Sequence, residues 1–233
     1  MFTLLHLNTP PAESLKSQLL QMVVDYFSDL SPLPLQPSNP LYALYQYVLG
    51  YEVHLYLQGM GSDANASARL LLALADEDPL HVLGFALYLP CIDDPQAATL
   101  LYLAVNSAQR RQGIGRALLK QLRLLHPHLA LACVPNQVAM FRQLGFQVLG
   151  ARGPQVLMNS QAQAADGWVA VQDLQPIFQS REVRQIHAYL LKQHGSQAMR
   201  QAERQRDRLL DQLTRQALTM AEHPGNQIGR AHV

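Results

Sequence analysis

Residues 99–119 constrain the fold more than any other stretch, because they join an apolar segment to an amphipathic helix through a Gly-x-Gly turn. Gly113 and Gly115 carry no Cβ atom, so the backbone can turn tightly there and a ligand can approach it closely. The first N–H groups of the following helix have no partner within the helix and attract anions. Positive charge surrounds the turn, from Arg110, Arg111 and Arg116. The stretch therefore predicts a phosphate-binding turn between a strand and a helix.

The spacing around the two glycines separates three kinds of phosphate-binding loop. A nucleoside triphosphate loop requires Lys and then Ser or Thr after its last glycine, whereas Arg116 and Ala117 follow Gly115. A dinucleotide-binding turn requires a third glycine where Leu118 stands and an acidic residue about 20 positions further on, where the chain is apolar. The sequence thus disfavours both nucleotide hydrolysis and dinucleotide binding.

The remaining pattern is Arg110-x-x-Gly113-x-Gly115 after a strand that ends in Leu103–Val105, and it resembles the coenzyme A pyrophosphate motif of the GNAT superfamily of N-acetyltransferases. Downstream, an apolar strand over 129–134 precedes a helical segment that ends in Leu-Gly-Phe at 144–146. The resemblance covers about residues 68–159. It implies an α/β fold of the α+β kind, with a central, mostly antiparallel mixed sheet flanked by helices.

The resemblance also implies acetyl-CoA as cosubstrate. Main-chain amides would hold its pyrophosphate, and the strand before the turn would hydrogen-bond the pantetheine arm, which requires that strand to splay from its neighbour beginning near Leu129. The N–H of Val105 would stabilise the thioester oxygen as it gains charge, and Asn136 would contact the pantetheine, so these two are the candidate catalytic residues. The implied cofactor-binding residues are Leu103, Ala104, Val105, Gln109, Arg110, Arg111, Gln112, Gly113, Ile114, Gly115, Arg116 and Asn136.

Acetyl transfer to an amine requires a proton acceptor, because a primary amine is mostly protonated at neutral pH. The strand before the turn has no acidic residue, and the candidates elsewhere are Glu52, His54, His81, Asp93 and Asp94. Many members of the resembled family carry a tyrosine that protonates the departing thiolate where this chain has Phe141. Other residues available as proton donors are Tyr102, Ser107 and Cys133.

Hydrophobic periodicity predicts the other elements. The expected segments are a strand over 3–8, a helix from Pro10–Pro11 through Asp29, a loop over 31–40, a helix over 41–60 in preference to a strand, a hairpin of 69–76 with 80–90, and a strand over 99–106. Residues 1–159 are expected to form the acetyltransferase domain, and residues 160–233 a linker with a C-terminal helical extension. Leu210, Leu213, Ala217 and Met220 have coiled-coil spacing, and we expect them to pack on their own domain, with a homodimer through these helices as the alternative.

Composition narrows the partners and the compartment. The 233 residues hold two cysteines, too few for a disulfide framework, and the spacing of Cys91 and Cys133 suggests no metal site. No apolar stretch approaches membrane-spanning length, so we expect no membrane association. With so few cysteines, we expect the protein to be cytoplasmic. The arginines of residues 200–215 alternate with acidic residues, which favours an ion-paired helix over nucleic-acid binding.

Charge is divided unevenly along the chain, and this bears on the acceptor. Residues 1–109 contain two basic and ten acidic side chains, and residues 110–233 contain sixteen basic and seven acidic ones. An acidic half attracts a cationic amine and a basic half a polyanionic cofactor. We therefore expect acetyl transfer from acetyl-CoA to a primary amine by direct attack, with a small cationic amine favoured over a peptide or protein amine. The alternative is a weakly catalytic or non-catalytic GNAT-like acyl-CoA sensor or interaction module.

Overall fold

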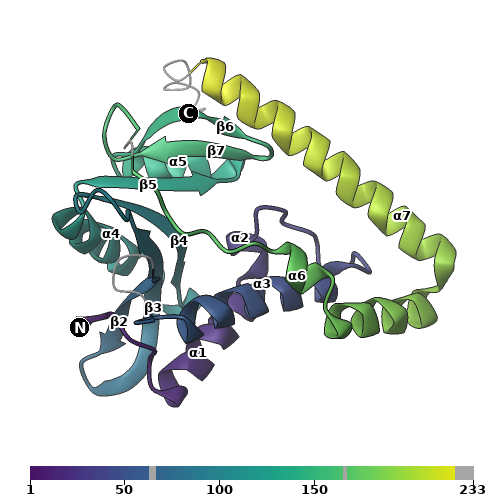
Figure 1. Cartoon of the computed structure of the whole chain (residues 1–233), viewed down its shortest axis with the longest axis horizontal. Coiled ribbons are helices and arrows are strands. Elements are labelled where there is room, and N and C mark those ends of the chain that lie inside the picture. The colour runs from purple at the N-terminus through teal and green to yellow at the C-terminus, as the bar shows by residue number, and fades with distance from the viewer. Residues whose placement is uncertain (63–66, 165–166, 224–233) are drawn as a thin grey trace.

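Seven strands of the described chain form one mixed sheet in the order β1-β2-β3-β4-β5-β7-β6 (Figure 1). The structure is a computed structural model that describes residues 1–62, 67–164 and 167–223. The pair β4–β5 is parallel, and every other neighbouring pair is antiparallel. This confirms the expected mostly antiparallel mixed sheet. The strands are β1 (Phe2–Leu7), β2 (Arg69–Ala75), β3 (Asp78–Pro90), β4 (Ala97–Val105), β5 (His128–Cys133), β6 (Gln147–Arg152) and β7 (Gln155–Asn159).

Helices cover both faces of the sheet, which explains why β2 is an almost unbroken apolar run. Its side chains alternate between two cores: Leu70 and Leu72 pack on one side, and Leu71 and Ala73 on the other. Strands buried on both faces lose the alternation of apolar and polar residues. The first core lies under α1 (Glu13–Asp25) and α3 (Tyr42–Gln58), and the second under α4 (Ile114–Leu125) and α5 (Val138–Gln143).

The helix expected from Pro10 through Asp29 is broken at Tyr26. Its first part is α1, and a single turn, α2 (Phe27–Leu30), follows. Tyr26 leaves helical geometry at φ −107° and ψ 25°. The Tyr26 hydroxyl accepts a hydrogen bond from the Ser107 backbone N–H at 2.7 Å, a tertiary contact that local periodicity does not encode. The helix preferred over 41–60 is confirmed as α3.

After β7 the chain crosses to α6 (Gln175–Phe178) and continues into α7 (Arg181–Glu222), which bends at Gly195 (Figure 1). Gly195 has φ 79° and ψ 159°, a conformation that favours glycine. The second part of α7 returns to β6 and β7, where Leu213 and Ala217 are buried while Leu210 is 39% exposed. The extension thus packs on its own domain, and the homodimer stays a prediction. Although α7 has 42 residues, no helix in the described ranges is apolar enough to cross a membrane.

Candidate active site

The sheet opens between β4 and β5, beside the end of β4. The two strands pair only from Ala97 with His128 to Leu100 with Leu131, although β4 continues to Val105. The pairing of β4 with β3 also shifts here, because Leu87 pairs with Tyr102 and Tyr88 with Leu100. Leu101 is therefore an extra, bulged residue, and a bulge bends a strand and re-aims its side chains. The expected splay is present.

The backbone of β4 faces this gap at two positions. Asn106 N–H donates to the Leu83 carbonyl of β3 at 2.8 Å, so the Asn106 backbone points toward β3. Backbone groups alternate in direction along an antiparallel strand, so those of Val105 and Leu103 point away from β3 and toward the gap. The gap therefore exposes main-chain donors and acceptors with the spacing that another extended chain requires.

A cavity of about 660 Å³ joins the gap to the glycine turn. Ten of the twelve predicted cofactor residues line it, and Gln112 and Asn136 do not. Asn136 is the middle residue of a 3₁₀ turn, η2 (Pro135–Gln137), whose neighbours Pro135 and Val138 are buried, so Asn136 itself faces solvent. Gln137 lines the cavity instead. Besides residues of the gap and the turn, the lining includes Tyr26, Asp29, Leu30, Leu131, Ala132, Cys133, Met140, Phe141 and Leu144.

The glycine turn presents unpartnered N–H groups to this cavity. Gly113 caps α4 with φ +84°, in the left-handed region, and Arg111 is also left-handed at φ +65°. This helix end has no capping hydrogen bond from a side chain. A Cβ atom on Gly115 would meet only the Val105 side chain, at 3.6 Å, so the space above it belongs to the cavity. The turn has the free donors and the room that a phosphate group needs.

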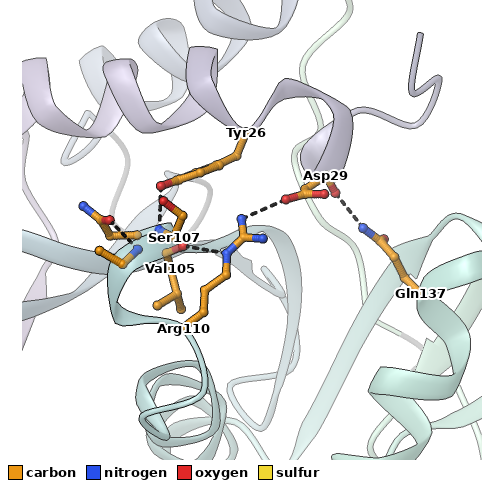
Figure 2. A network of polar contacts seen from close by, with 8 residues as sticks. Tyr26, Asp29, Val105, Ser107, Arg110 and Gln137 are labelled. Atoms are coloured by element: carbon orange, nitrogen blue, oxygen red, sulfur yellow. Dashed lines mark hydrogen bonds and ion pairs between the residues drawn. The ribbon is translucent and has the colours of Figure 1, made fainter. Parts of the chain in front are cut away.

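Arg110 ties the turn to the break between α1 and α2 (Figure 2). Its guanidinium lies 4.8 Å from the centre of the Tyr26 ring and 2.8 Å from the Asp29 carboxylate, while its Nε donates to the Val105 carbonyl at 3.2 Å. Gln137 Nε2 donates to the Asp29 carbonyl at 2.6 Å. This set of contacts, the Arg110 clamp, spans the mouth of the gap from β4 to η2. Sequence reasoning missed Tyr26, Asp29 and Gln137, which lie far from the turn in the chain.

Comparison with known proteins finds a family match over part of the chain. Residues 67–148 match the sequence model of the acetyltransferase (GNAT) domain. This part of the chain is a GNAT domain. The solved structure of the PaiA N-acetyltransferase from Thermoplasma acidophilum in complex with coenzyme A has the same fold, with a TM-score of 0.52 and 15% identity over 68% of this chain and 99% of that chain. Escherichia coli ElaA gives a TM-score of 0.46, 17% identity and coverage of 69% and 100%. No curated protein matches the chain in sequence.

On the α3 side of the sheet, a carboxyl group lies beside two phenols. Tyr102 follows the bulge in β4 and hydrogen-bonds Glu52 of α3. Tyr56 lies one helical turn after Glu52, on the same face of α3. Burial raises the pKa of Glu52 above its ordinary value, and the hydrogen bond from Tyr102 opposes this rise. Burial and the nearby carboxylate raise the pKa of the Tyr102 phenol well above its ordinary range. Glu52 does not line the cavity itself, but it is the acidic candidate that hydrogen-bonds a lining residue, Tyr102.

The other acid–base candidates have local roles or stand apart from the cavity. The Asp93 carboxylate accepts the Trp168 N–H at 2.9 Å, and Asp94 accepts the Gln96 N–H at 2.9 Å. His54 stacks on Tyr51 with ring centres 5.8 Å apart, and His81 is exposed. No group of three or more potential metal-ligating side chains gathers within the described parts of the chain.

Cys133 and Phe141 line the cavity on the β5 side. Burial raises the pKa of the Cys133 thiol to about 12, and its Sγ lies 3.7 Å from Met158 Sδ. Phe141 is buried and packs edge-to-face on Phe146 with ring centres 5.8 Å apart. The position at which the resembled family commonly has a phenol therefore provides an apolar wall. Ser107, the remaining proton-donor candidate, donates its backbone N–H to Tyr26.

Proposed function

We propose that the chain is an acetyl-CoA-dependent N-acetyltransferase whose acceptor is a primary amine. One observation carries the proposal: a single cavity runs from the unpartnered N–H groups of the glycine turn into the gap beside the unpaired half of β4. The groups that could bind a phosphate and the strand that could pair with an extended arm thus lie one after the other along the same cavity. The GNAT match over residues 67–148 supports the same assignment, as does the fold shared with a coenzyme A complex.

Charged side chains and main-chain groups would both bind the cofactor. Main-chain amides from Arg111 to Gly115 would hold a pyrophosphate, because the Gln109 and Arg110 N–H groups already donate to Asn106 and Ser107. Arg110, Arg111 and Arg116 would supply the balancing charge. The gap-facing backbone of Leu103 would pair with an amide of a pantetheine arm, because the Val105 carbonyl already accepts a hydrogen bond from Arg110 Nε. Val105 N–H would donate to the thioester oxygen as that oxygen gains charge. Gln137, rather than the exposed Asn136, would make the contact from η2.

Glu52 is the proton acceptor in this proposal. When bound, acetyl-CoA supplies a thioester carbonyl carbon that an amine nitrogen can attack. The N–C bond forms, the C–S bond breaks, its electron pair leaves on sulfur, and the proton lost by the nitrogen goes to the Glu52 carboxylate. A raised pKa brings a carboxylate closer to working pH and makes it a better base. The acidic N-terminal half favours a small cationic amine as the acceptor.

The ionisation of Cys133 favours direct attack over an acetylated cysteine intermediate. A nucleophilic cysteine reacts as its thiolate. With a pKa of about 12, only about one Cys133 thiol in 10⁵ is ionised at pH 7. The same value makes Cys133 a poor proton donor toward a leaving thiolate whose ordinary pKa is about 8.5. The sulfur would therefore leave as a thiolate and take its proton from solvent.

A second candidate is an acyl-CoA-binding sensor with little catalysis, and Phe141 is the observation that favours it. The Phe141 side chain has no hydroxyl to protonate the leaving group, and a general acid contributes about 10²–10⁴ in rate. A sensor and an enzyme would bind acyl-CoA in the same cavity, so a binding measurement does not distinguish the two functions. Turnover with an amine does.

The test has two stages. Coenzyme A at about 100 times its Kd should stabilise the chain by about 2.7 kcal/mol, which raises Tm by about 5–11 °C at this chain length. Acetyl-CoA with 1-aminobutane, 1,4-diaminobutane, spermidine or a lysine-containing hexapeptide should then release free thiol. Absence of any Tm shift would refute the cofactor assignment. A full shift without thiol release from the whole panel would favour the sensor.

A further inference from the structure

Asp29 supplies a carboxylate to a cavity that is otherwise rich in arginine. Among the described residues that line the cavity, no other has an acidic side chain, whereas Arg110, Arg111 and Arg116 all line it. The Asp29 side chain is 56% exposed, so a ligand can reach it without any rearrangement of the core. A cationic ligand in this cavity therefore finds its ion-pairing partner in Asp29.

The Asp29 carboxylate is paired with Arg110 close to the end of β4. Arg110 Nη2 lies 2.8 Å from Asp29 Oδ2 (Figure 2). The Nε atom of the same guanidinium donates to the Val105 carbonyl at 3.2 Å. A single guanidinium group thus separates the Asp29 carboxylate from the strand end beside which the thioester is proposed to lie.

The backbone and the side chain of Asp29 have separate partners. Its carbonyl accepts a hydrogen bond from Gln137 Nε2 at 2.6 Å, and this contact ties α2 to η2. Its carboxylate, among the described residues, bonds Arg110 alone. The carboxylate can therefore exchange Arg110 for another cation while the backbone contact keeps α2 in place.

A bound cofactor would offer Arg110 a stronger partner than Asp29. Arg110 lies at the start of the glycine turn, where the pyrophosphate is proposed to bind. A pyrophosphate carries more negative charge than one carboxylate, and a guanidinium forms paired, charge-assisted hydrogen bonds with phosphate oxygens. When the phosphates attract the guanidinium, the Asp29 carboxylate loses its counter-ion while it still faces the cavity. A cation supplied by the acceptor would replace it.

We propose that Asp29 binds the non-reacting ammonium group of a diamine acceptor once acetyl-CoA has taken Arg110 from it. This inference rests on the proposed acetyltransferase function and narrows the acceptor to an amine with a second positive charge. The reacting nitrogen lies beside Val105 and the second ammonium beside Asp29. Each ligand strengthens the binding of the other, because each releases the group that the other needs.

The kinetic test compares two substrates that differ in one charge. 1,4-Diaminobutane and 1-aminobutane have the same carbon chain, and the diamine alone has a second ammonium group. At low ionic strength the wild type should favour the diamine about 2- to 5-fold in kcat/KM, through KM, as expected for an exposed ion pair. This preference should fall as salt is added, because salt screens exposed charges.

The variant Asp29→Asn keeps the shape of the side chain and removes its charge. It should abolish the preference for the diamine and leave kcat/KM for 1-aminobutane within about twofold of the wild-type value. The matched control is Asp25→Asn, because Asp25 is an exposed carboxylate four positions earlier that accepts a hydrogen bond from Gln21 and does not line the cavity. Asp25→Asn should keep the wild-type preference.

Binding without turnover gives a second readout. In calorimetric titrations of the wild type, saturating coenzyme A should raise the affinity for 1,4-diaminobutane about 2- to 5-fold, and saturating diamine should raise the affinity for coenzyme A by the same factor. 1-Aminobutane should have neither effect. The coupling should disappear in Asp29→Asn, although this variant binds coenzyme A at least as tightly as the wild type does.

The outcomes distinguish the two proposals. A wild type that shows no Tm shift with coenzyme A, or that releases no thiol with any amine, would contradict the acetyltransferase function and this inference with it. A wild type that acetylates 1-aminobutane and 1,4-diaminobutane equally well would overturn the role of Asp29 alone. A preference for the diamine that persists in Asp29→Asn, or that Asp25→Asn abolishes to the same extent, would also overturn that role.

Discussion

Replacing Gly115 by tryptophan should abolish cofactor binding without unfolding the chain. Gly115 lies in the first turn of α4 and lines the cavity. Its backbone accepts a side chain, because a Cβ atom there would make only an ordinary contact of 3.6 Å with Val105. A non-glycine residue also removes the helix penalty of glycine, about 0.5–1 kcal/mol relative to alanine. The indole beyond that Cβ has no space except the cavity, where it would displace the pyrophosphate.

The magnitude follows from the binding equilibrium. Saturation of the wild type at about 100 times Kd gives about 2.7 kcal/mol of stabilisation and a Tm rise of about 5–11 °C, and Gly115→Trp should lose nearly all of this rise. The matched control is Gly50→Trp in α3, where a Cβ atom meets nothing within 4 Å and the residue does not line the cavity. Differential scanning fluorimetry with and without coenzyme A provides the assay. A folded Gly115→Trp variant with an undiminished rise would show that the phosphates bind elsewhere.

Three further changes test single groups. Asp29→Asn should free Arg110 and tighten coenzyme A binding about 1.4- to 5-fold at low ionic strength, because the exposed ion pair contributes about 0.2–1 kcal/mol. Calorimetric titration measures this change. An equal effect of Asp25→Asn would exclude the Arg110–Asp29 ion pair as its cause. Cys133→Ala should keep thiol release within about twofold, whereas mass-spectrometric detection of acetyl on Cys133 would contradict direct attack. Glu52 has a raised pKa in the folded chain, so its contribution to stability falls as pH rises through that pKa. Glu52→Gln should therefore raise Tm more at pH 7 than at pH 4, and it should abolish the acid limb of the wild-type rate profile. A rate unchanged by this substitution would remove Glu52 from the mechanism.

The glycine turn and the gap beside β4 can be predicted from the sequence because their determinants are local. Backbone conformation at Gly113, the free donors of α4 and the apolar strand before them are all encoded within about twenty consecutive residues. Asn136 does not line the cavity, for an equally local reason. The 3₁₀ turn has three residues per turn, and burial of Pro135 leaves Asn136 facing solvent, so a one-residue offset replaces it with Gln137.

The surroundings of the gap could not be predicted in the same way, because their contacts join distant parts of the chain. Arg110 meets Asp29 across 81 positions, and Gln172 meets Tyr56 across 116. No periodicity or motif marks either pair. The break at Tyr26 has the same origin, since the residues from Pro10 to Asp29 have continuous helical spacing and Tyr26 is distinguished by contacts with the distant Ser107 and Arg110.

The expected boundary after residue 159 coincides with the end of β7, yet the two sides of that boundary share their cores. Ile177, Val183 and Leu190 are buried in the core under α1 and α3, and Ala217 is buried in the core under α4 and α5. If the extension served only to bind a partner, residues 1–159 would close both cores by themselves. Here the extension packs on the core under α1 and α3, and α7 then returns to β6 and β7. The extension is therefore a structural part of both cores.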